Sequence, residues 1–199
     1  MRWADVLDLV FPPACAECDA PGSGLCAACF RPSAPVHFML DDLPCVALGA
    51  YEGVLRRAVL AVKSGRRDVG HTLGSLLGER IDRRSVDALV PVLTTAARRR
   101  QRGFDQGDLL ARAASRVCGV PIAALLRQTA GDAQRGRTRE ARLAAVGRFS
   151  LTGASFVQGS RVVLVDDVAT TGATLRDCAR TLRAAGLKVT GALVVAQAA

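Results

Sequence analysis

Aromatic residues are scarce in this chain of 199 residues, with one Trp, one Tyr and six Phe. Lysine is scarcer still, because only Lys63 and Lys188 stand among the 27 basic residues and all the others are arginines. The few aromatic residues are scattered, which argues against an extended surface for base stacking. The formal net charge is +9. A coding bias toward arginine and a surface for phosphates or nucleic acid both explain this excess, and composition does not separate them.

Long apolar runs are also missing. No stretch of about 18 uncharged apolar residues is present, so the sequence predicts no membrane-spanning helix. Asp5 and Asp8 interrupt the apolar stretch near the N-terminus, which makes it a poor signal peptide. We therefore expect a cytoplasmic protein. Half of the residues are hydrophobic, which is enough for an ordinary folded core and argues against overall disorder.

The seven cysteines do not suit a disulfide framework, because their number is odd and the expected compartment is reducing. Four of them form two Cys-x-x-Cys pairs separated by seven residues, which is the pair geometry of a closed structural zinc site. The predicted ligands are Cys15, Cys18, Cys26 and Cys29. The alternative is two pairs of buried or redox-active thiols. A segment this small and polar does not bury enough surface to fold without a metal, which favours zinc.

The remaining cysteines and the two histidines are not predicted to bind the metal. Cys45 is predicted to lie outside the metal site, and Cys118 and Cys178 stand on apolar helix faces, where a buried thiol is ordinary core. His37 and His71 are isolated and are expected to play no part.

Hydrophobic periodicity predicts an α/β fold with a mainly parallel sheet flanked by helices. Residues 1–45 are rich in Cys, Pro and Gly and are expected to form a zinc-binding head, and residues 46–199 form the main domain. Expected strands are residues 46–51, 88–93, 161–165 and 188–195, and expected helices are residues 53–64, 72–81, 105–117 and 174–185. Residues 131–148 are polar and rich in arginine, which predicts a mobile loop with some helix.

The strongest functional signal is residues 162–175, where a β-branched run ends in two acids, a Thr/Gly turn and a helix start. Open α/β sheets bind ligands at the carboxyl ends of their strands. The N–H groups at a helix start suit a phosphate, and Gly172 allows close approach of the backbone. Thr170, Thr171 and Thr174 add hydroxyl donors. The competing interpretation is an ordinary strand, turn and helix with a Thr cap. No Gly-Lys-Ser/Thr follows the glycine, so a Walker-type loop is excluded.

A second basic segment follows the expected strand at residues 88–93. Arg98 and Arg102 precede Gly103 and a helix start, which is what a bound diphosphate would use. The alternative is a solvated basic turn. Lys63 is a further candidate for a diphosphate contact, although a solvent-facing position on its helix is slightly favoured.

Residues 162–175 resemble the phosphoribosyl diphosphate (PRPP) signature of type I phosphoribosyltransferases. The resemblance implies that Asp166 and Asp167 bind the ribose hydroxyls and that Mg²⁺ arrives with the diphosphate of PRPP. It also implies a fold of the type I phosphoribosyltransferase kind, in which catalysis is kept or lost. The residues that would hold the 5-phosphate are Ala169, Thr170, Thr171, Gly172, Ala173 and Thr174.

A narrower resemblance covers nearly the whole chain. Segments of ComF-type competence proteins are similar to the cysteine head, residues 60–65, Pro91-Val92 and residues 102–106, in the same order along the chain. Asp105 departs from that family's usual Asn. Four further positions complete the comparison. Gln134, Arg142 and Phe149 match the family's spacing, and Ala145 stands where Asn is expected.

Three functions remain open at this stage. The first is an enzyme that transfers phosphoribosyl from PRPP to a nitrogenous acceptor, with residues 131–148 closing over the site. The second, implied by the ComF resemblance, is a factor for handling single-stranded DNA that works with DNA-uptake machinery and keeps a non-catalytic PRPP site. The third is a regulator that senses PRPP or nucleotides. A homodimer is left open, and the sequence does not name the acceptor.

Overall fold

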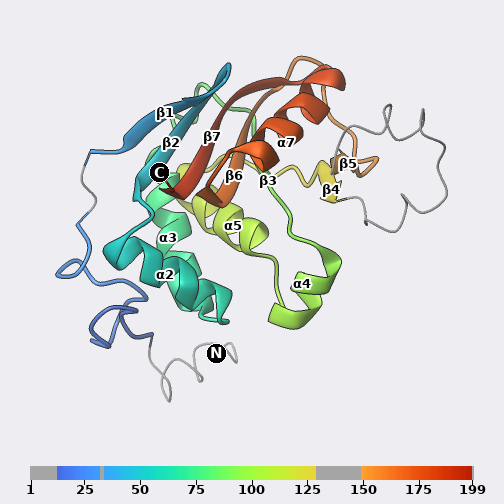
Figure 1. Ribbon diagram of the computed structural model, residues 1–199. Helices are drawn as coiled ribbons and strands as arrows, with labels where there is room; N and C mark the ends of the chain where they lie inside the picture. The colour runs from blue at the N-terminus through green and yellow to red at the C-terminus, as the bar shows by residue number, and fades with distance from the viewer. Residues whose placement is uncertain (1–12, 32–33, 129–148, 199) are drawn as a thin grey trace.

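A five-stranded sheet with helices on both faces forms the body of the computed structural model, which describes residues 13–31, 34–128 and 149–198. The strand order is β1-β2-β7-β6-β3 (Figure 1). Strands β2, β7, β6 and β3 run parallel, and β1 pairs antiparallel with β2 at one edge. The predicted α/β class with a mainly parallel sheet is confirmed.

The strands differ from the expected ones mainly at their ends, since β6 and β7 run further at their carboxyl ends and β3 stops earlier. Their bounds are β1 Val36–Leu40, β2 Leu43–Ala50, β3 Ala88–Pro91, β6 Arg161–Ala169 and β7 Lys188–Gln197. Two short strands, β4 Leu126–Gln128 and β5 Phe149–Leu151, form a separate antiparallel pair that the sequence did not predict. Strand β1 was also not expected, and β2 begins three residues earlier than position 46. The sheet therefore includes residues 36–45, which the sequence had grouped with the head.

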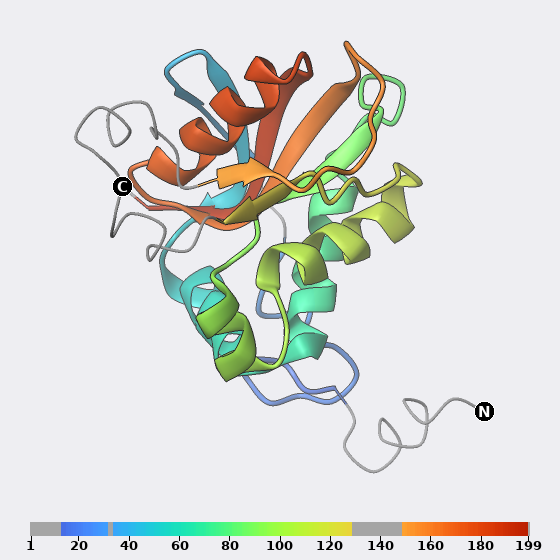
Figure 2. The ribbon, with the colours of Figure 1, turned by 90° about the vertical axis from the view of Figure 1, so that its right-hand side faces the viewer.

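Helices α2 Gly53–Lys63, α3 Arg67–Gly78 and α5 Gln106–Cys118 pack on one face of the sheet, and α7 Ala173–Ala184 packs on the other (Figure 2). Each face has its own core, which is built from Leu, Val and Ala side chains. Helix α3 lies very close to α5, because a Cβ on Gly74 would come within 2.6 Å of the Leu110 carbonyl oxygen. The short helix α4 Ala96–Arg102 buries none of its residues and projects from the body.

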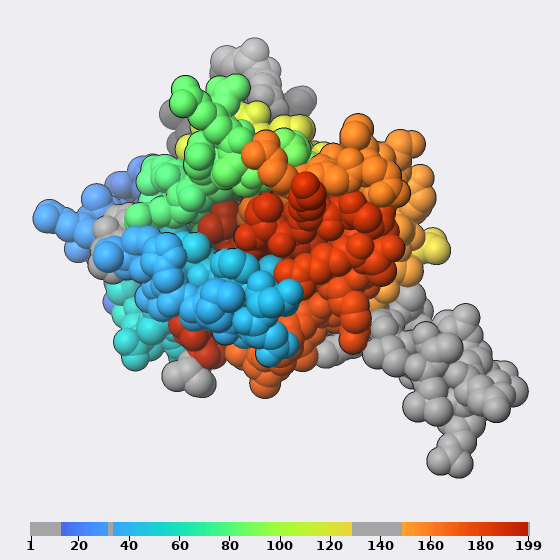
Figure 3. All heavy atoms as spheres, turned by 90° about the horizontal axis from the view of Figure 1, so that it is seen from above, coloured from blue at the N-terminus to red at the C-terminus, as the bar shows by residue number. Residues whose placement is uncertain are grey.

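The β1–β2 hairpin, where the sheet begins along the chain, lies beside α7 and β7, where it ends. Viewed from above, the β1–β2 hairpin lies against the region of α7 and β7 (Figure 3). Ion pairs join the hairpin tip to α7, with Arg183 Nη1 2.8 Å from Asp42 Oδ1 and Arg176 Nε 3.5 Å from Asp41 Oδ2. Among the described helices, none is long and apolar enough to cross a membrane.

Candidate functional site

A cavity of about 380 Å³ opens at the carboxyl ends of β3 and β6. The two strands are in register there, because Pro91 pairs with Val165 and the Val92 N–H donates to the Val165 carbonyl at 2.9 Å. Five of the ten residues predicted to bind PRPP line this cavity: Asp166, Asp167, Thr174, Arg98 and Arg102. The structure thus brings together residues from β6, α7 and α4 that lie up to 76 positions apart in the sequence, from 98 to 174.

The two carboxylates belong to β6 itself, which runs on to Ala169 rather than ending at residue 165. The Asp167 N–H donates to Asp166 Oδ1 at 2.8 Å, and the Val168 N–H donates to Asp167 Oδ1 at 2.8 Å. Burial, followed by the neighbouring charge of Asp167, raises the pKa of Asp166 well above its usual value. The two adjacent carboxylates therefore repel each other, and they can accept hydrogen bonds from hydroxyl groups or bind a cation.

Lys63 is the cation that faces these acids. Its Nζ lies 3.1 Å from Asp167 Oδ2, and its side chain is 30% exposed. The slight preference for a solvent-facing Lys63 is wrong. The last residue of α2 reaches the carboxyl edge of the sheet, which helical spacing alone does not reveal.

The predicted 5-phosphate loop follows at once. Ala169 is the last residue of β6, residues 170–172 make the turn, and Ala173 begins α7. The residues 169–173 lie next to the cavity along the chain but do not line it. Arg176 Nη2 donates to the Thr171 carbonyl at 2.8 Å, so the same arginine that pairs with Asp41 also holds the turn.

Gly172 has a left-handed φ of +72° and is in contact with the hairpin. A Cβ at this position would lie 2.5 Å from Leu40 Cδ2 and 2.6 Å from Leu40 Cδ1. Glycine is needed here for both the backbone angle and the space. The N–H of Ala173 donates weakly to Thr171 Oγ1 at 3.5 Å, and the next N–H groups of the first turn of α7 have no intrahelical acceptors, which leaves them for an anion.

The contacts of Asp105 explain why an Asp suits this position, where the ComF-type segment usually has Asn. Its Oδ1 accepts from the Asp108 N–H at 3.2 Å and caps α5, while its Oδ2 accepts from the Thr94 N–H at 2.8 Å. An amide has only one oxygen for these two donors. Burial raises the pKa of Asp105, and the two backbone N–H groups oppose that effect.

Several cavity residues were not among the predicted ligands. Gln106 and Phe149 stand in the ComF-like segments, so a signal for them existed, whereas Thr94 and Gln128 carried none. The full set outside the prediction is Lys63, Val92, Leu93, Thr94, Gln106, Gly107, Gln128, Phe149 and Val168. The loop expected at residues 131–148, with Gln134, Arg142 and Ala145, lies outside the described residues.

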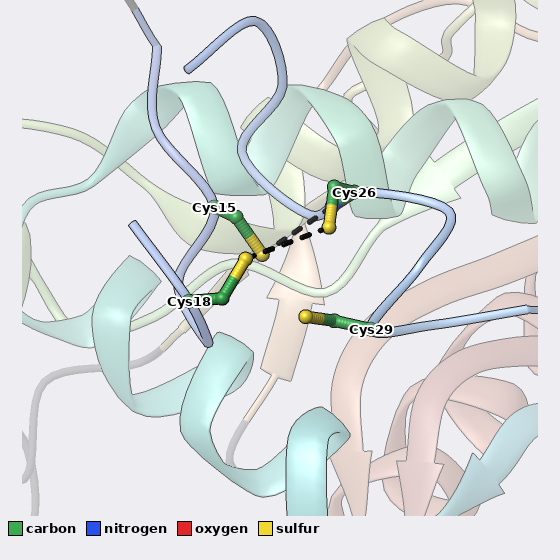
Figure 4. A group of neighbouring side chains, drawn as sticks. All are labelled: Cys15, Cys18, Cys26 and Cys29. Carbon is green, nitrogen blue, oxygen red and sulfur yellow. Dashed lines mark hydrogen bonds between the residues drawn. The ribbon is translucent and has the colours of Figure 1, made fainter. Parts of the chain in front are cut away.

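The four predicted zinc ligands form one cluster (Figure 4). The Sγ atoms of Cys15, Cys18, Cys26 and Cys29 all lie within 4.8 Å of one another, and those of Cys18 and Cys26 are 3.7 Å apart. A tetrahedron with Zn–S bonds of about 2.3 Å has S···S edges of about 3.8 Å, so the donor set and its size fit zinc. Cys45 lies in β2, outside the cluster, as expected.

The thiols also repel one another in their ionised form. Burial raises the pKa of Cys15, but backbone N–H groups from Cys26, Cys18 and Glu17 outweigh it and lower the value to about 6. Neighbouring Cys18 and Cys26 raise the pKa of Cys29. A divalent cation relieves this repulsion by binding all four thiolates.

The cysteine head is fastened to the α2–α3 turn. Arg66 Nη2 donates to the Ala14 carbonyl, and the same guanidinium pairs with Asp68. A Cβ on Gly24 would come within 2.5 Å of Val69 Cα, so the head packs directly on the backbone of α3. Arg66 lies three residues after Lys63, so one short turn connects the cysteine cluster with the cavity.

Together, the sheet order and the acid pair with its facing cations describe an α/β protein with a polar, charged cavity at the carboxyl ends of its parallel strands. The chain belongs to the family described as phosphoribosyl transferase domain, whose model matches residues 66–199.

Solved structures with a similar fold include three enzymes. An allosteric regulatory enzyme of purine biosynthesis is 22% identical with a TM-score of 0.48, and the match covers 67% of this chain and 26% of that one. The glutamine PRPP amidotransferase of B. subtilis is 23% identical with a TM-score of 0.46 and the same two coverages, 67% and 26%. The adenine phosphoribosyltransferase of Leishmania donovani is 18% identical with a TM-score of 0.40, over 63% of this chain and 51% of that one. The match thus spans about a quarter of the first two enzymes.

Proposed function

We propose that the protein binds PRPP with Mg²⁺ in the cavity at the carboxyl ends of β3 and β6 and transfers its phosphoribosyl group to a nitrogenous acceptor. The acceptor nitrogen forms a bond to C1 of the ribose while the bond from C1 to the diphosphate oxygen breaks. The observation that carries this proposal is the placement of an acid pair and of two arginines in one cavity, beside the phosphate loop.

Each group has a role in this reaction. Asp166 and Asp167 accept hydrogen bonds from the ribose hydroxyls, and residues 169–174 hold the 5-phosphate at the start of α7. Arg98 and Arg102 hold the diphosphate as it gains charge. Mg²⁺, when bound with PRPP, neutralises diphosphate charge. Burial and the charge of Asp167 raise the pKa of Asp166, and a nearby cation opposes this effect and favours the ionised carboxylate.

The finer assignment is membership of the ComF-type proteins, with a structural zinc ion on the four cysteines. The cysteine cluster and the ComF-like segments that line the cavity at Arg102, Gln106 and Phe149 support it. Zinc would hold the head on α3 and take no part in the transfer, because four protein thiolates complete its tetrahedron.

Calorimetric titration of Mg²⁺·PRPP into the zinc-loaded protein tests the binding step. The wild type should bind, and the double variant Asp166→Asn/Asp167→Asn should not. Asp82→Asn is the matched control, since Asp82 lies outside the cavity and an Asn keeps its acceptor for the Arg84 N–H. Diphosphate release is then measured with a panel of nitrogenous acceptors. A wild type that does not bind PRPP refutes the proposal, and binding without release for every acceptor refutes the transfer.

A second candidate is the handling of single-stranded DNA. A hollow of about 760 Å³ beside α4 is lined by Arg67, Arg99 and Arg100, and also by Asp108 in its ion pair with Arg112. The Arg67 guanidinium stacks 4.9 Å from the centre of the Phe104 ring, which gives the hollow one cation–aromatic platform. Filter binding at rising salt tests it, because each lost phosphate contact lowers the salt slope. Arg99→Ser/Arg100→Ser should flatten the slope, and no affinity at low salt would exclude this function.

A further inference from the structure

Gln106, the first residue of α5, is a buried amide with one half of its hydrogen-bonding capacity unused. Its side chain lines the cavity, although the residue is only 5% exposed. Its Oε1 accepts from Arg102 Nη1 at 2.7 Å, while its Nε2 has no partner in the part of the chain that the structure describes. A buried donor without an acceptor is costly, so it marks a place where a ligand completes the bonding.

Arg102 depends on this amide for its orientation. It is the half-buried last residue of α4, a helix with no fully buried residue, and its one side-chain hydrogen bond within the described residues is to Gln106. Arg98, one turn earlier, has no hydrogen bond or ion pair from its guanidinium to any described residue, and its backbone N–H donates to Thr95 Oγ1. Of the two arginines in the cavity, Arg102 is thus the one held in place.

The partner of Arg102 is neutral. Arg112, by contrast, pairs with the carboxylate of Asp108 at 2.7 Å, which neutralises it. An amide oxygen fixes a guanidinium while leaving its whole positive charge for a ligand. The Gln106–Arg102 pair therefore combines a defined geometry with an uncompensated cation, which suits a strongly anionic group.

The backbone around Gln106 is fixed on both sides. Asp105 binds the Thr94 N–H and caps α5, and Gly107 lies so close to β3 that a Cβ on it would be 2.1 Å from the Val92 carbonyl oxygen. The amide is thereby presented from a rigid position, as a specificity-determining group requires.

We propose that Gln106 selects for a diphosphate. It positions Arg102 through Oε1 and donates from Nε2 to an oxygen of the diphosphate that Arg102 binds, because the oxygen and nitrogen of one amide lie side by side. This inference rests on the proposed function and assigns its diphosphate subsite. Ribose 5-phosphate lacks that group and is held by the acid pair and the loop at residues 169–174, so its binding does not use Gln106.

Calorimetry with three ligands, Mg²⁺·PRPP, Mg²⁺·diphosphate and ribose 5-phosphate, tests this selection. Gln106→Glu keeps an acceptor for Arg102 but removes the donor and neutralises the arginine. It should weaken PRPP and diphosphate by about 10- to 100-fold and leave ribose 5-phosphate within about twofold. Gln101→Glu, on the exposed side of α4, is the matched control for charge and should change all three ligands little.

A second variant avoids any change in the buried core. Arg102→Gln on the projecting helix α4 should give the same loss of selectivity, and adding Gln106→Glu to it should cost less than in the wild type, since the two act as a unit. Equal weakening of all three ligands, or no weakening by either variant, overturns the inference while PRPP binding by the wild type preserves the proposed function. A wild type that binds none of the ligands overturns both.

Discussion

Replacing Gly172 by alanine perturbs the phosphate loop in two separable ways. An L-residue in the left-handed region costs about 1 to 2 kcal/mol. The added Cβ would also lie 2.5 Å and 2.6 Å from the two terminal methyl carbons of Leu40, and overpacking of this kind costs about 1 to 3 kcal/mol. We expect Gly172→Ala to lower the free energy of unfolding by about 2 to 5 kcal/mol, the sum of these two ranges, and to weaken PRPP binding because the turn shifts.

Two variants separate the two terms. Gly159 has a φ of +77° with nothing within 4 Å of its Cβ position, so Gly159→Ala should show the backbone cost alone. Leu40→Ala should relieve the overlap, so that the double variant Leu40→Ala/Gly172→Ala is less destabilised than the sum of its parts by about 1 to 3 kcal/mol. Urea denaturation gives the energies and calorimetry gives the affinity. Strict additivity, or equal effects at positions 159 and 172, would refute the reasoning.

Three further outcomes are expected. Lys63→Met should lower the free energy of unfolding by about 1 kcal/mol through loss of the pair with Asp167, whereas Lys188→Met, at an exposed position, should not; equal losses in urea denaturation would contradict this. Burial and Asp167 raise the pKa of Asp166 in the folded state above its unfolded value, so its contribution to stability falls as pH rises from about 4 toward the folded pKa. The free energy of unfolding of Asp166→Asn should therefore increase relative to that of the wild type as the pH rises. A pH-independent difference in urea midpoints would argue against this. Removal of zinc with a chelator should lower both the melting temperature and the PRPP affinity, and Cys18→Ser should reproduce both effects. An unchanged affinity would show that the head does not influence Lys63 and the cavity.

The sheet was largely predictable because its central strands are continuous apolar runs. The β-branched residues of β6 and β7 indicate strands, and the helices that cover these strands have regularly spaced apolar residues. Strand β1 was missed because it is an edge strand of five residues with His37 and Met39 exposed, next to a segment rich in Pro and Cys. Helix α4 was not predicted, since it has no apolar face to signal a helix.

The candidate site was predictable where its residues are consecutive. The acid pair and the loop at residues 169–174 form one motif, and the two Cys-x-x-Cys pairs form another. The pairing of Lys63 with Asp167 was missed because the two residues are remote in sequence, and only the packing of α2 against the sheet brings them together. The role of Gln106 depends on Arg102 and on the close packing of α5 on β3, neither of which a linear pattern records.

The β1–β2 hairpin has a consequence for how the sheet ends. The family match begins at residue 66, yet β2 covers the open side of β7 from Cys45 opposite Ala192 to Ala50 opposite Gln197. A fragment starting at residue 66 would expose this edge along a strand whose residues 191–196 are buried. Bare apolar edges recruit strands from other molecules and lead to aggregation. The hairpin therefore covers the apolar edge of β7 and leaves as the outer edge β1, a strand of five residues none of which is fully buried.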